Sequence, residues 1–437
     1  MTTSRRIQFG VFFQGVNFGT IWSSDHSGSQ YEFESFRRIA HTAERGLFSA
    51  FFLGEGLRLR EHFGRIHDLD IAGRPDAQTQ LAALAAVTDR IGLVATQNTT
   101  YNDPYDLARR LNSLDLISEG RAGWNVVTTD NAWTGANFRR GGYLDHADRY
   151  RRAAQFVEAA QWLWDAGADG VGTPVEVDRD LVSFTGPAPL PPSPQGRPVL
   201  FQAGDSDEGR EFAAASADVI FSAHPGLEEA IAFAADLRRR LPAHGRGADE
   251  LKFFPGAQFI LAPTDAEARE KAEWVTRAQV SPQTAVRFLE PIWGRDLSDF
   301  DADGPLPDID PVVDEVDGAR GSLFQGRRAW ETAREWRESA AAEGLSIREF
   351  VIKRSSLRTF VGGYSTIADR IVQYVDAHAV DGFNVSPYLV PEGLDDIVDG
   401  LIPELRERGV YPTEYPGTTL RENLGLPAVG ERAEIAA

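Results

Sequence analysis

Short apolar segments alternate with amphipathic helical patterns along most of this 437-residue chain, and this alternation constrains the fold more than any other feature. Several segments are apolar without interruption, as parallel strands are when both of their faces are buried. Eight such strands with intervening helices predict a (β/α)8 TIM barrel of the α/β class, although an open doubly wound sheet would show the same alternation. The count favours the barrel. The predicted strands span residues 7–13, 50–53, 91–96, 123–127, 198–203, 219–222, 258–261 and 382–385.

The segment 148–164, DRYRRAAQFVEAAQWLW, illustrates the helical pattern between two strands. Its apolar residues recur at the spacing of one helix face, which is typical of a helix that packs on a sheet. The predicted stripe comprises Tyr150, Ala153, Ala154, Val157, Ala160, Gln161 and Trp164, whereas Arg151, Arg152, Gln155 and Glu158 lie mostly off it.

Two stretches depart from the alternation. Residues 167–197 contain GPAPLPPSPQGRP, whose prolines cannot donate to a sheet, so we predict a long loop before the fifth strand. Residues 281–358 hold an acidic run and then a helical stretch, and we expect a lid before the last strand, with Trp330, Trp336 and Phe350 buried against the barrel mouth. The tail 409–437 is expected to be an extended strap. We therefore predict a single barrel domain over residues 1–437 with long insertions before the fifth and last strands.

The charge balance limits the partners of the chain. Its 45 Lys and Arg residues against 65 Asp and Glu give a formal charge of −20, which disfavours nucleic acid and anionic membrane surfaces. The absence of cysteine excludes disulfides and thiolate chemistry and is compatible with a reducing cytosol. There is neither the apolar region of a signal peptide nor a run of about 18 uncharged apolar residues. We expect a cytoplasmic protein with no nucleic-acid or membrane partner.

Polar residues follow several predicted strands, at the end of a barrel where ligands bind. Glu55 follows the second strand, and Thr128 follows the fourth. Thr96 and Asn98 close the third strand two positions apart, so they point to the same side, toward the barrel mouth. Any one of these residues is equally explained as an ordinary strand end or helix cap, and only their combination indicates a site.

The segment QAGDSDEGREFAAASAD after the fifth strand has the pattern of an anion site. Ala203 ends the strand, Gly204 permits an unusual turn, and Ser206 is placed to cap the following helix. The N–H groups at that helix start, assisted by Arg210, would bind a phosphate. An ordinary capped helix is the alternative interpretation.

Three long motifs occur in one order along the chain: TQNTTYNDPYDLARRLNSLDLISEGRAGWNVVTT (96–129), HADRYRRAAQFVEAAQWLWD (146–165) and GRPVLFQAGDSDEGREFAA (196–214). With them the chain resembles the bacterial luciferase-like flavin monooxygenases, in the branch of the nitrilotriacetate, EDTA and dibenzothiophene sulfone monooxygenases and pristinamycin synthase. The resemblance covers nearly the whole chain. It implies a TIM barrel that takes reduced FMN (FMNH2) from a separate flavin reductase. Such enzymes react it with O2 and use the flavin C4a-peroxide to oxygenate a small molecule: an amine, aminocarboxylate, sulfone or heterocycle.

The same resemblance implies which residues bind the flavin. Carried over by position, the contacts fall on Glu55, Thr96, His146, Tyr150 and Ser206, with Asn98 and Thr128 nearby. The family often has Asp where this chain has Glu55, so that contact would reach further. His146 and Tyr150 stand four residues apart at a predicted helix start and would share one face.

Residues that assist the chemistry directly are harder to assign. His26 and His62 belong to loops that would overhang the site, and they are our candidates for a catalytic role against the alternative of polar surface histidines. No metal site is expected, because no second ligand cluster supports His67 and its acidic neighbours. A deazaflavin-dependent oxidoreductase and a flavin-binding barrel without catalysis are the alternative functions. We further expect a homodimer or homotetramer.

Overall fold

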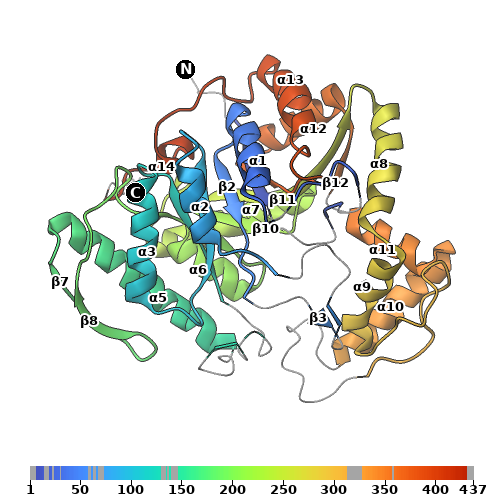
Figure 1. Cartoon of the computed structure of the whole chain (residues 1–437), viewed down its shortest axis with the longest axis horizontal. Helices are drawn as coiled ribbons and strands as arrows, with labels where there is room; N and C mark the ends of the chain where they lie inside the picture. The colour runs from blue at the N-terminus through green and yellow to red at the C-terminus, as the bar shows by residue number, and fades with distance from the viewer. Residues whose placement is uncertain are drawn as a thin grey trace.

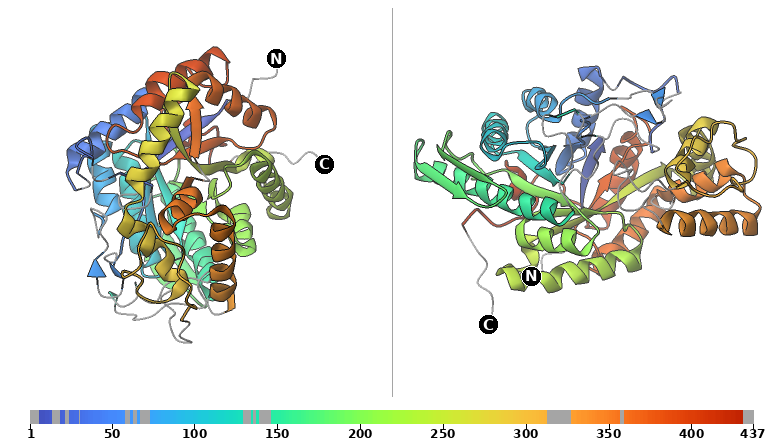
Figure 2. Two further views of the ribbon diagram at one scale, coloured as in Figure 1. Left: turned by 90° about the vertical axis from the view of Figure 1, so that its right-hand side faces the viewer. Right: turned by 90° about the horizontal axis from the view of Figure 1, so that it is seen from below.

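The structure of the chain is a barrel with two projections on opposite sides, as the views in Figures 1 and 2 agree. The computed structural model describes residues 6–13, 19–21, 24–29, 31–57, 61–62, 65–66, 73–128, 134, 137–138, 146–312, 327–356 and 359–430. For residues 61–62, 65–66, 146–147 and 327–328 it describes the backbone alone.

Eight parallel strands of the described chain form a closed ring, which confirms the predicted (β/α)8 barrel. Each strand pairs with the next in the order β1–β2–β5–β6–β9–β10–β11–β13, and β13 returns to β1. The pairing of β10 with β11 leaves the ring without a free edge, which an open doubly wound sheet would retain. The ring strands are β1 (Gln8–Phe13), β2 (Ala50–Leu53), β5 (Gly92–Asn98), β6 (Ala122–Val127), β9 (Val199–Ala203), β10 (Val219–Ser222), β11 (Lys252–Ala262) and β13 (Gly382–Val385).

The seventh ring strand differs from its prediction. The predicted segment 258–261 lies in the second half of β11, which leaves the ring and pairs in parallel with β12 (Thr359–Gly363). The first half closes the ring, pairing through Lys252–Pro255 with β10 and then through Gly256 and Ala257 with β13. Pro255 and Gly256 interrupt the apolar pattern there, and Pro255 stands where the pairing passes from one neighbour to the other.

Helices cover the outside of the ring, and their apolar stripes face the strands. In α1 (Phe33–Arg45), for example, Phe36, Ile39, Ala40 and Ala43 are all buried, at the spacing of one helix face. The other covering helices are α2 (Ala77–Ala85), α3 (Pro104–Ile117), α5 (His146–Asp169), α6 (Asp207–Ser216), α7 (Leu227–Arg240), α8 (Asp265–Gln279), α12 (Tyr364–Asp376) and α13 (Ile402–Glu407), with η1 (Leu241–His244), η2 (Ala248–Glu250) and η5 (Ile397–Leu401) between them. No helix among the described residues is long and apolar enough to cross a membrane.

Two positions of α5 correct the predicted stripe. Ala154 is exposed, and Arg152 is buried, with 7% of its surface accessible. The guanidinium of Arg152 is satisfied by backbone carbonyls: Nε donates to Thr99 O at 2.8 Å and Nη2 to Asn102 O at 3.1 Å. A charged residue is therefore buried here because the loop after β5 supplies its acceptors.

An apolar cluster fills part of the interior of the ring, and the C-terminal strap closes the ring at one end. Neighbouring Phe12 and Phe52 rings lie 4.7 Å apart between centroids, and Phe52 and Phe221 lie 5.0 Å apart. Leu420, in α14 (Leu420–Asn423), joins the same buried cluster with Leu424 and Leu426. The backbone N–H of Leu420 donates to Gly120 O at 3.0 Å, just before β6 begins. The strap thus seals the end of the barrel at which the strands begin.

The predicted loop 167–197 contains a β-hairpin that projects on one side of the barrel (Figure 1). Its antiparallel strands are β7 (Pro174–Asp178) and β8 (Ser183–Pro187). Residues of β7 alternate between exposed and buried, with Val175 and Val177 inward, so the hairpin needs only one covered face. A second short hairpin follows β2 and consists of β3 (Glu61–His62) and β4 (Arg65–Ile66).

The insertion, residues 280–356, projects on the opposite side and has a hydrophobic cluster of its own. It contains α9 (Pro282–Trp293), α10 (Arg327–Glu343) and α11 (Ile347–Ser355). Trp336 packs 5.5 Å from Phe350 and 6.3 Å from Trp293, whereas Trp330 is 47% exposed. The expectation that Trp330, Trp336 and Phe350 bury against the barrel mouth is therefore wrong, because the insertion supplies the partners of its own aromatic residues. Its role as a lid stays a prediction.

Candidate active site

Glu55 and Asn98 meet at the barrel end where the strands finish. Glu55 follows β2, and Asn98 is the last residue of β5 and is buried. The Asn98 Nδ2 group donates to both carboxylate oxygens of Glu55, at 3.1 and 3.0 Å. The Asn98 Oδ1 atom in turn accepts the backbone N–H of Tyr101 at 2.7 Å, which fixes the orientation of the amide. Burial raises the pKa of the Glu55 carboxyl to about 7.

Thr96 lies two residues before Asn98 on the same face of β5, so both project into the ring as predicted. Its hydroxyl accepts a hydrogen bond from Asn125 Nδ2, on β6, at 3.1 Å. Asn125 is 3% exposed, and its Oδ1 atom is buried without a hydrogen-bond partner. Because buried acceptors are normally satisfied, this atom is a place where a bound ligand could donate. Thr128, one residue after β6, is half-buried.

The loop between β9 and α6 brings four predicted residues together. Ser206 caps α6, and its hydroxyl accepts the N–H of Gly209 at 3.1 Å. A methyl group on Gly209 would lie 3.0 Å from Gly204 Cα and 3.1 Å from the Tyr150 hydroxyl. Gly204 and Gly209 are therefore required for the close approach of loop and helix, and Tyr150 lies directly over the helix start. Ala203 ends β9 and is exposed.

Arg210 is directed away from an anion at this helix start. Its Nη1 donates to Asp236 Oδ2 at 3.1 Å, and its guanidinium lies 4.5 Å from the centre of the Phe233 ring. Its Nε donates to the carbonyl of Asp205 at 3.1 Å, so it supports the loop from behind. Arg210 therefore supports the loop in the structure, and its predicted part in binding a phosphate stays a prediction.

Loops after three neighbouring ring strands are tied to one another. Asn137, after β6, donates to Leu57 O, after β2, at 3.1 Å. Phe138 stacks on Tyr101, after β5, with ring centroids 4.3 Å apart. With Arg152 holding the loop after β5 from α5, the Glu55 and Asn98 pair stands on a fixed rim. Sequence reasoning missed Asn125, Arg152 and Phe138, although the two-residue spacing of Gly123, Asn125 and Val127 would have placed Asn125 inside the ring.

Three predicted histidines are not brought into this arrangement by the described residues. His146 begins α5, but its side chain lies outside the described residues, as does that of His62 in β3. His26 has a side chain that is 72% exposed, and its Nδ1 lies 3.7 Å from Glu392 Oε2. The part of the chain that the structure describes contains no group of three or more acidic or histidine residues able to hold a metal ion, and His67 lies outside it.

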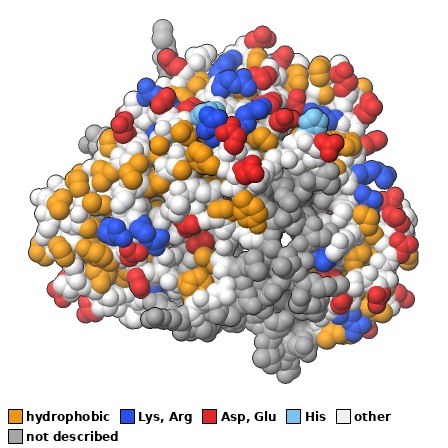
Figure 3. All heavy atoms as spheres, viewed as in Figure 1, with side chains coloured by type: hydrophobic (Ala, Val, Ile, Leu, Met, Phe, Trp, Pro, Cys, Tyr) orange, Lys and Arg blue, Asp and Glu red, His pale blue; other side chains and the backbone are white. Residues whose placement is uncertain are grey.

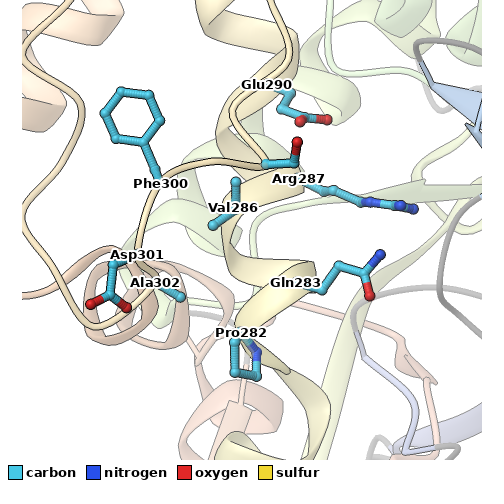
Figure 4. A pocket seen from close by; sticks show the side chains of 9 residues that line it. Pro282, Gln283, Val286, Arg287, Glu290, Phe300, Asp301 and Ala302 are labelled. Carbon is cyan, nitrogen blue, oxygen red and sulfur yellow. The ribbon is translucent and has the colours of Figure 1, made fainter.

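A hollow of about 410 Å³ lies within the insertion, between α9 and residues 298–302. Figure 4 shows Phe300 and Asp301 on one side of α9, and Arg287 and Gln283 pointing to the other. Glu290 is 1% exposed, and its carboxylate accepts the backbone N–H of Leu297 at 3.0 Å, so it holds the loop that returns along the helix. This hollow belongs to the packing of the insertion and is separate from the Glu55 site.

The charge of the chain limits how an anion could be bound. On the face drawn in Figure 3, acidic and basic side chains are interspersed over the described surface. The formal charge of −20 would oppose long-range attraction of an anion. A phosphate would therefore depend on short-range N–H donors such as those at the start of α6.

Comparisons with known proteins show the family of the chain. Residues 7–380 match the family described as luciferase-like monooxygenase. The chain is 37% identical to nitrilotriacetate monooxygenase component A of Aminobacter aminovorans, with 98% of each chain covered. It is 35% identical to N-acetyl-S-(2-succino)cysteine monooxygenase of Bacillus subtilis (strain 168), again with 98% of each covered. A riboflavin lyase solved with modified FMN and riboflavin superposes with a TM-score of 0.78 at 29% identity, covering 98% of this chain and 100% of that chain.

Proposed function

Because the chain belongs to the luciferase-like monooxygenase family and is a flavin-dependent monooxygenase, we propose that it is the oxygenating component of a two-component system. In this proposal a separate reductase supplies reduced FMN, and the chain uses it with O2 to oxygenate a small organic molecule. The relative named component A supports the division of labour between two proteins. Bound reduced flavin would supply the electrons that activate O2.

The ring of the flavin is proposed to lie at the Glu55, Asn98 and Thr96 side of the mouth. The orphaned Oδ1 of Asn125 fits a group that carries N–H donors, and the flavin ring has such donors along its edge. The tied loops after β2, β5 and β6 would hold the ring in one orientation and exclude water from its reacting side. Thr128 stands at the same rim, and His146 is kept as a proposed contact on the resemblance alone.

The phosphate is proposed to bind at the start of α6. Ser206 caps the helix, and Gly204 and Gly209 allow the loop to approach it closely. The first N–H groups of the helix would then bind the phosphate. The hydroxyl of Tyr150 lies over the same turn and is placed to donate to a phosphate oxygen. Arg210, the basic residue nearest this turn in sequence, is engaged by Asp236. The phosphate would therefore be bound mainly by backbone N–H groups.

The substrate class is proposed from the relatives. Nitrilotriacetate and N-acetyl-S-(2-succino)cysteine, named for the two relatives above, are both small carboxylated molecules. We propose an aminocarboxylate, amine, sulfone or heterocycle for this chain. Assembly as a homodimer or homotetramer is part of the proposal.

The observation that carries the proposal is the convergence of two separate groups of residues at one end of the barrel: the Glu55 and Asn98 pair, and the loop at Ser206. The test measures O2 uptake and NADH use with FMN, a generic flavin reductase and a panel of candidate substrates. The purified chain alone should consume no NADH, because it has no dinucleotide-binding motif. With the reductase present, one substrate should give product in step with O2. Product formation with a reduced deazaflavin and without O2 would instead establish the alternative oxidoreductase.

A further inference from the structure

Among the described residues, the carboxyl group of Glu55 meets only hydrogen-bond donors. Asn98 Nδ2 donates to both of its oxygens, and a hydrogen bond from the Asn98 backbone N–H also lowers the pKa of Glu55. Because Tyr101 N–H occupies Asn98 Oδ1, the amide cannot turn to offer an acceptor instead. Among the described residues, no acceptor contacts the Glu55 carboxyl group. A proton on Glu55 therefore has no acceptor within this pair and would be available to a bound ligand.

The charges around Glu55 leave it able to carry that proton near neutral pH. Burial raises its pKa to about 7, and the hydrogen bonds from Asn98 oppose this rise without cancelling it. Among the described residues, the charge of Asp76 raises the pKa further and that of Arg110 lowers it. Arg74 contacts the backbone of Glu55, where its Nη1 donates to the Glu55 carbonyl at 3.1 Å. No described cation forms an ion pair with the carboxylate itself.

We propose that Glu55 is a catalytic acid that delivers a proton to the oxygen atom released during turnover, with Asn98 holding its carboxyl group in position. The inference rests on the proposed function. Proton donation goes beyond the flavin contact proposed for Glu55, because a residue that only contacts the flavin need not carry a proton.

The proposed step balances with reduced flavin in its monoanionic form. Substrate, O2, the flavin monoanion and neutral Glu55 give oxygenated substrate, water, oxidised flavin and the Glu55 carboxylate. Two electrons come from the flavin and two from the substrate. The O–H bond of Glu55 breaks, its electron pair stays on the carboxylate, and the proton forms an O–H bond of the departing water. Solvent then returns a proton to Glu55.

A test without an identified substrate uses reduced FMN and O2 alone. The same proton is then needed to form hydrogen peroxide, since the flavin monoanion, O2 and one proton give oxidised flavin and H2O2. Enzyme loaded anaerobically with reduced FMN is mixed with oxygenated buffer between pH 5.5 and 9, and flavin absorbance and H2O2 are followed. We expect the slowest step of reoxidation on the enzyme to lose rate as the pH rises through about 7, where Glu55 loses its proton.

Variants separate proton donation from simple contact. Glu55→Gln keeps the size of the side chain but cannot donate in the same way, so the step should slow by roughly 100-fold and lose its dependence on pH. Glu55→Asp should restore part of the rate together with a pH limb. Asn98→Ala removes donors that lower the pKa of Glu55, so the limb should move to higher pH. A merely structural role for Asn98 would not move that limb in a defined direction.

The possible failures are distinguishable. If Glu55→Gln reoxidises flavin at the wild-type rate and with the wild-type pH limb while binding reduced FMN, Glu55 is not the acid. If Asn98→Ala moves the limb to lower pH, Asn98 does not act through Glu55. If wild-type protein leaves the reoxidation of FMN the same as in free solution at every pH, the proposed function itself fails.

Discussion

The phosphate assignment predicts that Ser206→Ala weakens binding of reduced FMN and spares reduced riboflavin, which lacks the phosphate. In the structure the Ser206 hydroxyl accepts the N–H of Gly209 at 3.1 Å, and its own O–H has no acceptor among the described residues. Bound phosphate would accept that O–H in a charge-assisted hydrogen bond. The substitution removes this bond and the cap together.

The two losses have different sizes and different readouts. Loss of an N-cap costs about 1 kcal/mol of folding stability, which affects both ligands alike. Loss of a hydrogen bond to a charged group costs about 1.5–3 kcal/mol, which is roughly a 10- to 150-fold rise in the dissociation constant for FMN. The dissociation constant for riboflavin should change by about twofold or less, because no charge-assisted bond is lost.

Ser346→Ala is the matched control. Ser346 caps α11 in the insertion, where its hydroxyl accepts the N–H of Glu349 at 3.2 Å, much as Ser206 does for α6. It should cost similar stability and leave the affinity for both flavins unchanged. Anaerobic fluorescence titration of reduced FMN and reduced riboflavin against the wild type and the two variants gives the six dissociation constants. Equal losses for FMN and riboflavin in Ser206→Ala, or an FMN loss in Ser346→Ala, would refute the assignment.

Three further outcomes are expected. Trp336→Ala should lower the free energy of unfolding of the insertion by about 3–5 kcal/mol, because this ring packs on Phe288 and Phe350 and not on the barrel. Limited proteolysis should then cut the insertion first, while flavin stays bound. If the insertion is a lid, the variant should also release more H2O2 per O2 consumed. Leu424→Ala should lower whole-chain stability by about 2–5 kcal/mol in a urea titration, since Leu424 is 1% exposed within the barrel interior. Folding favours neutral Glu55, because its pKa of about 7 in the folded protein exceeds the ordinary 4.5. Its contribution to stability is therefore complete below pH 4.5 and is lost as the pH rises through 7. Glu55→Gln should reduce the fall in the urea midpoint between pH 5 and pH 8, and an unchanged fall would contradict the raised pKa.

The strands of the barrel were predictable because burial on both faces leaves a continuous apolar run in the sequence. The β2 segment AFFL and the β10 segment VIFS match their predicted bounds. The first half of β11 was not predictable in this way, because a Pro-Gly pair such as Pro255 and Gly256 is typical of a turn. In the structure these residues lie within the strand, where its pairing passes from β10 to β13. The β7 and β8 hairpin was hidden by flanking prolines and by its single covered face.

The candidate site was predictable in its members more than in their contacts. The polar strand ends identified Glu55, Thr96 and Asn98, and helix capping identified Ser206. The direction of Arg210 depends on Asp236, 26 residues away on the next helix, which no local pattern indicates. The same is true of the aromatic residues of the insertion. A large apolar side chain such as Trp336 is expected to be buried, but the sequence does not indicate that it packs on Phe350.

The strap that seals the barrel has a consequence for how the chain is made. Gly92 begins β5, and a side chain there would collide with Leu420, so the strand keeps a notch that Leu420 fills. These two positions leave the ribosome far apart in time, and the notch stays exposed to water until the later segment arrives. During synthesis the end of the ring that the strap later covers therefore stays open and apolar. Chaperone capture of newly made chains should thus persist until residues 420–426 pack against the ring.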